Sequence, residues 1–213
     1  PEELSLRFPW LNTEGLSGGG LLDEFKNAFN KPDNGLIQII LINLVVFVGL
    51  ILLRVILTLT GGAEIYRSVV EWLMLPAALP ELAKKPWTLV TYAFLHGGIW
   101  PIFFNMLLLY YVARIFFNYF GPRRFINVYF LGVMLGGAFF LLAYNLFPAF
   151  YGSQSPLIGA SAGVMAVLIF ICTYIPQQEV RVIFFNVKLL YIGAFFLLFD
   201  LVFIPLNDNA GGR

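Results

Sequence analysis

Charged residues and cysteines are scarce in this sequence. Charged residues make up 12% of its 213 positions, against roughly a quarter in a typical soluble domain. The single cysteine, Cys172, lies within an apolar run, so a disulfide framework is excluded and the thiol is expected to pack among helices. The net charge is +1 and no basic run occurs, which argues against nucleic acid or another polyanion as a partner.

Apolar residues are abundant instead. Hydrophobic residues make up 60% of the chain, and phenylalanine alone occurs 23 times. A soluble domain of this length could not bury so much apolar surface. The composition therefore predicts an all-α, polytopic helical bundle within a lipid bilayer.

Residues 1–34 differ from the rest because they combine glycines, alternating charges and several asparagines. We expect a mobile segment here, with one short amphipathic helix around Leu21–Phe29. No signal peptide is expected, because the first long apolar run comes later and is too long. The chain opens with Pro1 and stops at Arg213 in a glycine-rich stretch, so we expect a fragment trimmed at both ends.

Residues 35–213 are predicted to form a transmembrane domain with five spans. A hydrocarbon core of about 30 Å needs roughly 20 helical residues. Between the first two spans, Glu64–Leu75 has the spacing of a short interfacial helix, and an irregular hairpin ending at Trp87 should follow it. The predicted spans cover about 36–59, 96–118, 125–147, 159–175 and 183–205.

Basic residues are distributed unevenly over the predicted connections, which sets the orientation. Eight lie on the side of the N-terminus and four on the opposite side, so a cytoplasmic N-terminus is predicted. His96, Asn105 and Ser161 then fall in the same, outer half of the membrane. The eight are Arg7, Lys26, Lys31, Arg114, Arg123, Arg124, Arg181 and Lys188, and the four are Arg54, Arg67, Lys84 and Lys85.

Two polar side chains, Ser161 and Asn105, interrupt neighbouring apolar spans at similar depth. The Gly-x-Ser-x-Gly pattern at Gly159–Gly163 is typical of a nucleophile elbow in soluble hydrolases. The same glycines also form a small-xxx-small face of the kind that lets membrane helices pack closely. Asn105 has a comparable alternative, a hydrogen bond between helices. Their convergence in one half of the membrane favours a shared site.

Four motifs stand out along the chain: Pro86–His96, Phe104-Asn105-Met106, Phe120–Phe125 with Tyr129, and Gly159–Gly163. In their order and spacing they resemble the rhomboid family of intramembrane serine proteases. The resemblance covers about residues 36–213 and extends through Asp200 to Asn209–Gly212. It implies a six-helix core, of which five spans are present and the sixth is missing, cleavage of single-span membrane proteins, and no metal or cofactor.

The resemblance implies that Ser161 is the nucleophile and that Asn105 donates to the oxyanion. A serine needs a neighbouring base, and the family's dyad histidine would lie on a sixth span beyond Arg213. Gly159 and Ala160 would support the oxyanion site, where the start of a helix offers amide donors.

Four further residues are expected at the edges of this site. His96 matches a structural histidine of the family at the end of the first loop. Asp200 is an acid in an apolar span, hence a functional candidate, although its place near the span end favours a bond to loop amides. Phe104 and Phe196 are candidates for a lateral gate through which a substrate helix enters, or else lipid-facing aromatic residues.

One residue departs from the family pattern. Pro101 stands where the family usually has a second histidine, four residues before Asn105, and a proline offers no side-chain donor. The intact motif around Ser161 favours a bacterial serine protease of the inner membrane. Pro101 favours the alternative, a pseudoprotease that binds transmembrane segments without cleavage. A transporter or channel would predict inverted repeats, and the sequence has no such internal symmetry.

Overall fold

The computed structural model describes residues 34–150, 155–182 and 185–203. Three of its helices are long and apolar enough to cross a membrane: α3 (Gly35–Leu59), α7 (Ile99–Phe116) and α8 (Pro122–Leu146). Two further apolar helices are shorter, α9 (Ser161–Tyr174) and α10 (Leu189–Phe203). The predicted fold class, a helical membrane bundle, is confirmed. The predicted N-terminal helix at 21–29 lies outside the described residues.

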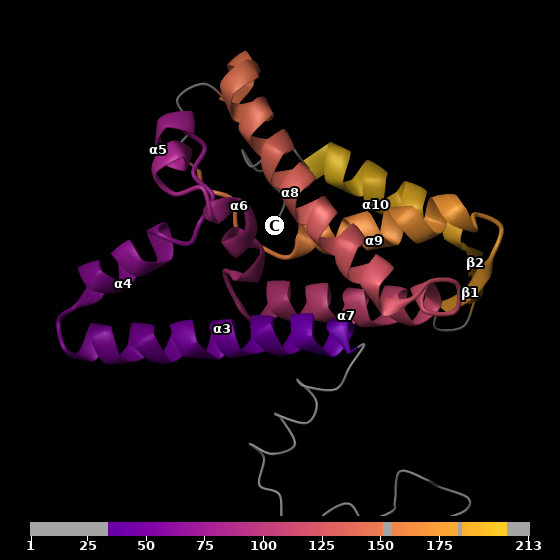
Figure 1. The fold of residues 1–213 in the computed structure, drawn as a ribbon, viewed down its shortest axis with the longest axis horizontal. Coiled ribbons are helices and arrows are strands. Elements are labelled where there is room, and N and C mark those ends of the chain that lie inside the picture. Colours follow the sequence, from indigo (N-terminus) through magenta and orange to yellow (C-terminus); the bar gives the residue numbers. More distant parts are fainter. Residues whose placement is uncertain (1–33, 151–154, 183–184, 204–213) are drawn as a thin grey trace, which may run out of the picture.

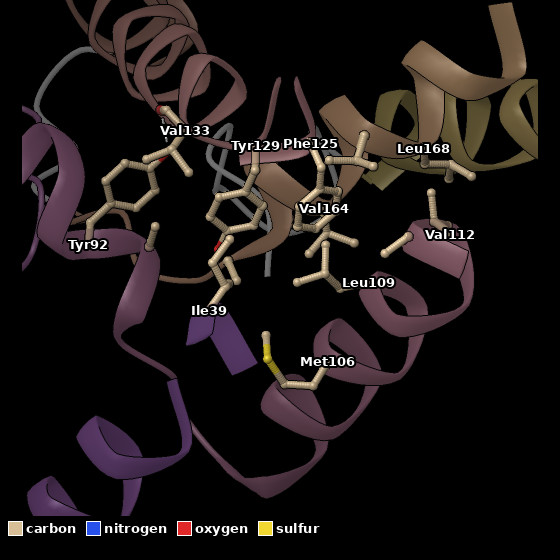
Figure 2. Packing of buried hydrophobic residues seen from close by; sticks show 14 of the residues in the cluster. Ile39, Tyr92, Met106, Leu109, Val112, Phe125, Tyr129, Val133, Val164 and Leu168 are labelled. Carbon is tan, nitrogen blue, oxygen red and sulfur yellow. Dashed lines mark hydrogen bonds between the residues drawn. The ribbon is translucent and has the colours of Figure 1, made fainter. Parts of the chain in front are cut away.

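Helix α9 is the centre of the bundle, because it packs against α7, α8 and α10 (Figure 1). It runs alongside α7 in the same direction, while α3 packs against α7 and α8. The buried core lies where these helices meet, with Ile39 of α3, Leu109 of α7, Tyr129 of α8 and Val164 of α9 among its members (Figure 2). The first residues of α7 and α9 therefore lie at the same end of the bundle.

Small residues bring α8 and α9 together. Gly132 faces Ala166, and a Cβ atom on Gly136 would lie 2.6 Å from the Cβ of Ala162. Glycine and alanine at such positions let helix backbones approach closely in membranes. Gly163 belongs to the same contact, because it lies against the ring of Tyr129. This glycine of the Gly-x-Ser-x-Gly pattern thus serves packing.

The connection between α3 and α7 carries the predicted interfacial helix, α4 (Ala63–Glu71), on which no residue is buried. The following segment is more regular than expected, with α5 (Leu79–Lys84), α6 (Thr88–Thr91) and the 3₁₀ helix η3 (Tyr92–Phe94). Pro80 lies in the first turn of α5, where a missing N–H breaks no helical hydrogen bond, so a helix begins within the segment that was expected to be an irregular hairpin.

The fifth span was predicted to begin at residue 183, which is too early. Residues 185–188 form strand β2 (Phe185–Lys188), which pairs antiparallel with β1 (Glu179–Val182), and α10 begins only at Leu189. The reason is local, because polar and β-branched residues alternate through Glu179–Val182 with the period of a strand.

Smaller shifts occur at other helix ends. The second span was expected near His96, but α7 begins at Ile99, after two glycines. Helix α8 begins earlier than expected, at Pro122, and a short 3₁₀ helix, η4 (Pro148–Phe150), follows it. The fourth span was expected from Gly159, but α9 begins at Ser161 because Gly159 has a non-helical backbone conformation.

Candidate active site

Ser161 is the first residue of α9, and the loop before it is held on two sides. Leu157 pairs with Leu75 in a short antiparallel bridge, with N–O distances of 2.9 and 3.2 Å. The amide of Gly159 donates to the carbonyl of Tyr92 at 3.0 Å. Gly159 has a φ of 118°, in a region that residues with a Cβ atom rarely adopt. The sequence can make this turn because a glycine stands two positions before the serine.

Ser161 is partly buried, and its neighbours Gly159 and Ala160 are buried. Within the described ranges its hydroxyl makes no hydrogen bond, and the amides of Ser161, Ala162 and Gly163 donate to no carbonyl. Free amides and the helix dipole make such an end attractive to negative charge. The start of α9 can therefore stabilise an oxyanion that develops next to the Ser161 hydroxyl.

Asn105 lies on α7, one turn after Pro101, and is partly buried. Its Nδ2 donates to the carbonyl of Pro101 at 2.9 Å. An amide nitrogen carries two N–H groups, so one remains for a second acceptor. Pro101 is the third residue of α7, within its first turn, where proline is tolerated.

The contact between α7 and α9 indicates how Asn105 and Ser161 lie relative to one another. Leu109 of α7 and Val164 of α9 are both fully buried and point toward one another (Figure 2). Because the two helices run in the same direction, one turn back along each leads from Leu109 to Asn105 and from Val164 to Ser161. The two predicted polar residues thus occupy corresponding positions on neighbouring helices.

His96 lies between η3 and α7, on the segment that supports the serine loop. A Cβ atom on the adjacent Gly97 would lie 3.7 Å from the side chain of Ile158. Both ring nitrogens of His96 are buried without a hydrogen-bond partner in the part of the chain that the structure describes. Burial lowers the pKa of His96. These surroundings suit the predicted structural role, which stays a prediction.

The predicted gate residues lie in different surroundings. Phe104 is 60% exposed and stacks with Trp100, with 6.1 Å between their ring centroids. Phe196 of α10 is partly buried and lines a cavity of about 900 Å³ between α7 and α10, whose lining does not include Phe104. The gate therefore stays a prediction. The backbone of Asp200 belongs to α10, but its side chain lies outside the described residues.

Sequence reasoning assigned no role to Tyr92 or Asn43. Tyr92 is fully buried, and its hydroxyl donates to the carbonyl of Val133 at 2.7 Å, so it ties the serine loop to α8. Asn43 is fully buried in α3, and its Nδ2 donates to the carbonyl of Ile39 at 2.8 Å. The signal for Asn43 was present, because it is a polar residue in an apolar span, as Asn105 is.

A protein-family model described as the Rhomboid domain matches residues 83–211. The matched range begins in α5 and includes η3, α7, α8, the serine loop, α9 and α10. No curated protein and no solved structure matches the chain significantly. The match therefore covers every residue of the candidate site that the sequence singled out.

Proposed function

Because the chain belongs to the rhomboid family, we propose that it is an intramembrane serine endopeptidase that cleaves single-span membrane proteins. The observation that supports this proposal is the start of α9, where Ser161 has free backbone amides, next to α7, on which Asn105 lies one turn before Leu109. We propose a multi-pass location in a bacterial inner membrane, with the N-terminus in the cytoplasm. No cofactor is needed for this chemistry.

In the proposed reaction the Ser161 oxygen attacks the carbonyl carbon of the scissile peptide bond. The bond from Oγ to carbon forms, the carbon–nitrogen bond breaks, and the leaving amine takes the serine proton by way of a base. We propose that this base is a histidine on a further helix C-terminal to Arg213. Water then hydrolyses the acyl-enzyme and regenerates the Ser161 hydroxyl.

The oxyanion would be stabilised by the Ser161 backbone amide and the second N–H of Asn105. Donors of this kind contribute about 3–4 kcal/mol each to the transition state. The bond from Asn105 Nδ2 to the Pro101 carbonyl supports this role, because it restricts the amide while leaving one N–H free. Gly159 and Ala160 add no side chain that would block a substrate carbonyl.

Pro101 favours a second candidate function, that of a pseudoprotease that binds transmembrane segments. At this position the family pattern has a histidine that contributes to the oxyanion site, whereas a proline has no side-chain donor. Activity would then depend on Asn105 and backbone amides alone. If these do not suffice, the fold would still bind a substrate helix without cleaving it.

Fluorophosphonate labelling of the full-length protein, together with cleavage of a single-span reporter, separates the two functions. For a protease, the wild type is labelled and cleaves, Ser161→Ala does neither, and Ser68→Ala behaves as wild type because Ser68 lies on the exposed helix α4. We expect Asn105→Ala to lower cleavage about 10²-fold to 10³-fold.

Two outcomes would decide against the protease. The first is a folded wild-type protein that is neither labelled nor able to cleave. The second is equal labelling of Ser161→Ala. A Pro101→His variant that gains cleavage from an inactive wild type would identify the missing donor as the cause and support the pseudoprotease.

A further inference from the structure

Asn43 is a polar side chain in the first half of the apolar helix α3. It is fully buried and ends the buried stripe of this helix, which begins at Gly35 and continues through Ile39. Its Nδ2 donates to the Ile39 carbonyl at 2.8 Å, which leaves the second N–H and Oδ1 for a neighbour. A leucine would fill a similar space without burying polar atoms. Packing alone therefore does not account for an asparagine at this place.

The polar neighbour of Asn43 is Tyr129 of α8. The tyrosine is fully buried, and its hydroxyl end points toward Ile39 of α3 (Figure 2). The Asn43 side chain lies beside this hydroxyl and interacts with it. In the part of the chain that the structure describes, neither Asn43 Oδ1 nor the Tyr129 hydroxyl has another partner. Because each group would be left unpaired among apolar side chains, the two hold α3 and α8 in one relative position.

The ring of Tyr129 also supports the first turn of α9. A Cβ atom on Gly163 would lie 2.6 Å from Cε2 of this ring, so the ring and the helix are in direct contact. Gly163 stands two residues after Ser161, and a shift of the ring would move the turn that carries the serine. A chain of contacts thus leads from Asn43 through Tyr129 to Ser161. It starts on α3, which lies outside the residues that match the family model.

We propose that Asn43 is a positioning residue for Ser161 and acts through Tyr129. This inference rests on the proposed function, because the residue that it places is the nucleophile. Asn43 holds the Tyr129 hydroxyl, the hydroxyl fixes the ring, and the ring sets the position of the first turn of α9. Asn43 takes no part in bond formation or proton transfer. Reaction rates respond strongly to such placement, since a displacement of about 1 Å caused by a remote substitution can cost about 10²-fold.

A double-mutant cycle in the full-length protein tests this proposal. Asn43→Leu removes the amide, whereas Tyr129→Phe removes the hydroxyl and keeps the ring against Gly163. The measurements are kcat and KM for cleavage of a single-span reporter, and the rate of fluorophosphonate labelling, each per folded molecule. We expect either variant to lower kcat about tenfold with KM unchanged, since the reacting atoms are misplaced while the substrate is still bound. The double variant should be no slower than the single ones, because both changes break the same contact.

Thr173→Val is the matched control. The Thr173 hydroxyl donates to the Ile169 carbonyl one turn back, as Asn43 does to Ile39, but Thr173 is exposed near the other end of α9. We expect wild-type kcat in this variant. An equal loss in the control would overturn the proposal, because it would indicate a general response of the bundle to a lost polar side chain.

Three other results would decide against the proposal or against its premise. Single losses that multiply in the double variant would show that Asn43 acts independently of Tyr129, and a loss confined to KM would assign it to substrate binding. Should Asn43→Leu fail to fold, Tyr129→Phe decides alone, and wild-type kcat in that variant would overturn the proposal. A folded wild type that neither labels nor cleaves would refute the protease instead. The same cycle measured on the free energy of unfolding then tests the contact, and additive losses would exclude it.

Discussion

The ring of Tyr129 occupies the space that a Cβ atom on Gly163 would need, so glycine is the residue that fits at this position. Three ring atoms of Tyr129 lie 2.6, 2.8 and 2.9 Å from that position. The tyrosine is itself fully buried in α8, so the ring has little room to move. Together with the contact of Gly136 and Ala162, it holds the first turn of α9, and with it Ser161, against α8.

Gly163→Ala should therefore destabilise the protein. Forcing a methyl group into a packed core typically costs about 1–3 kcal/mol, and we expect a loss of that size in the free energy of unfolding in detergent. Gly49→Ala is the matched control, because nothing lies within 4 Å of the Cβ position on Gly49 and alanine favours a helix. Equal stability of the two variants would contradict the close contact.

Because the ring nitrogens of His96 are buried, we expect the free energy of unfolding to depend on pH. Its pKa is lowered by burial, so between the folded pKa and the unfolded value of about 6.5 the unfolded chain binds more protons. The His96 contribution is then present above about pH 6.5 and is lost as the pH falls through the folded pKa. Thermal unfolding measured from pH 7.5 to pH 5 should show this loss, and His96→Asn should reduce it. An unchanged pH profile in the variant would exclude His96 as the source.

At the scale of elements, the serine loop is held by segments that are distant in sequence. The Leu75–Leu157 bridge joins it to the stretch after α4, and Tyr92 of η3 binds both the Gly159 amide and the Val133 carbonyl of α8. The loop is thus attached to α8 and to the α3–α7 connection, although it belongs to neither. Such attachments reduce the freedom of the turn that presents Ser161.

Tyr92→Phe removes one of these attachments while keeping the ring. We expect a loss of about 1 kcal/mol in stability, the usual net contribution of an intramolecular hydrogen bond, together with weaker fluorophosphonate labelling at Ser161. Tyr174→Phe serves as the control, because Tyr174 is 57% exposed and its hydroxyl bonds to no residue of the described ranges. Normal labelling of the Tyr92 variant would show that the loop keeps its conformation without this bond.

The helices were largely predictable because long apolar runs leave few alternatives in a membrane. The β1–β2 hairpin was missed, since four-residue strands between two apolar helices carry a weak signal that the neighbouring hydrophobic run obscures. The serine and asparagine were found as polar residues in apolar spans. The attachments by Tyr92 and Leu75 were not predictable, because they depend on contacts between segments whose relative position no local pattern encodes.

At the scale of the whole molecule, the two ends of the bundle differ in the number of basic residues that they carry. Arg114, Arg123 and Arg124 lie near the turn between α7 and α8, at the end that also carries the hairpin, while Arg67 and Lys84 belong to α4 and α5 at the opposite end (Figure 1). This separation supports the proposed orientation, in which α4 and the start of α9 face away from the cytoplasm.

Cysteine accessibility in intact cells checks that orientation. Ser68→Cys on exposed α4 should react with a membrane-impermeant maleimide, whereas Gln177→Cys, exposed between α9 and β1, should react only after permeabilisation. The native Cys172 is buried, so the unmodified chain gives a low background. The opposite pattern would reverse the orientation.

The shortness of α9 has a consequence for the membrane around the protein. Its 14 residues extend for about 21 Å, roughly 9 Å less than a hydrocarbon core of about 30 Å. If Tyr174 lies at one membrane surface, Ser161 lies roughly 9 Å below the opposite surface. Water must therefore enter the membrane region to reach the Ser161 hydroxyl. In a thicker bilayer the Ser161 hydroxyl would lie deeper. The acyl length of the surrounding lipids should therefore control how fast a water-soluble reagent reaches this hydroxyl.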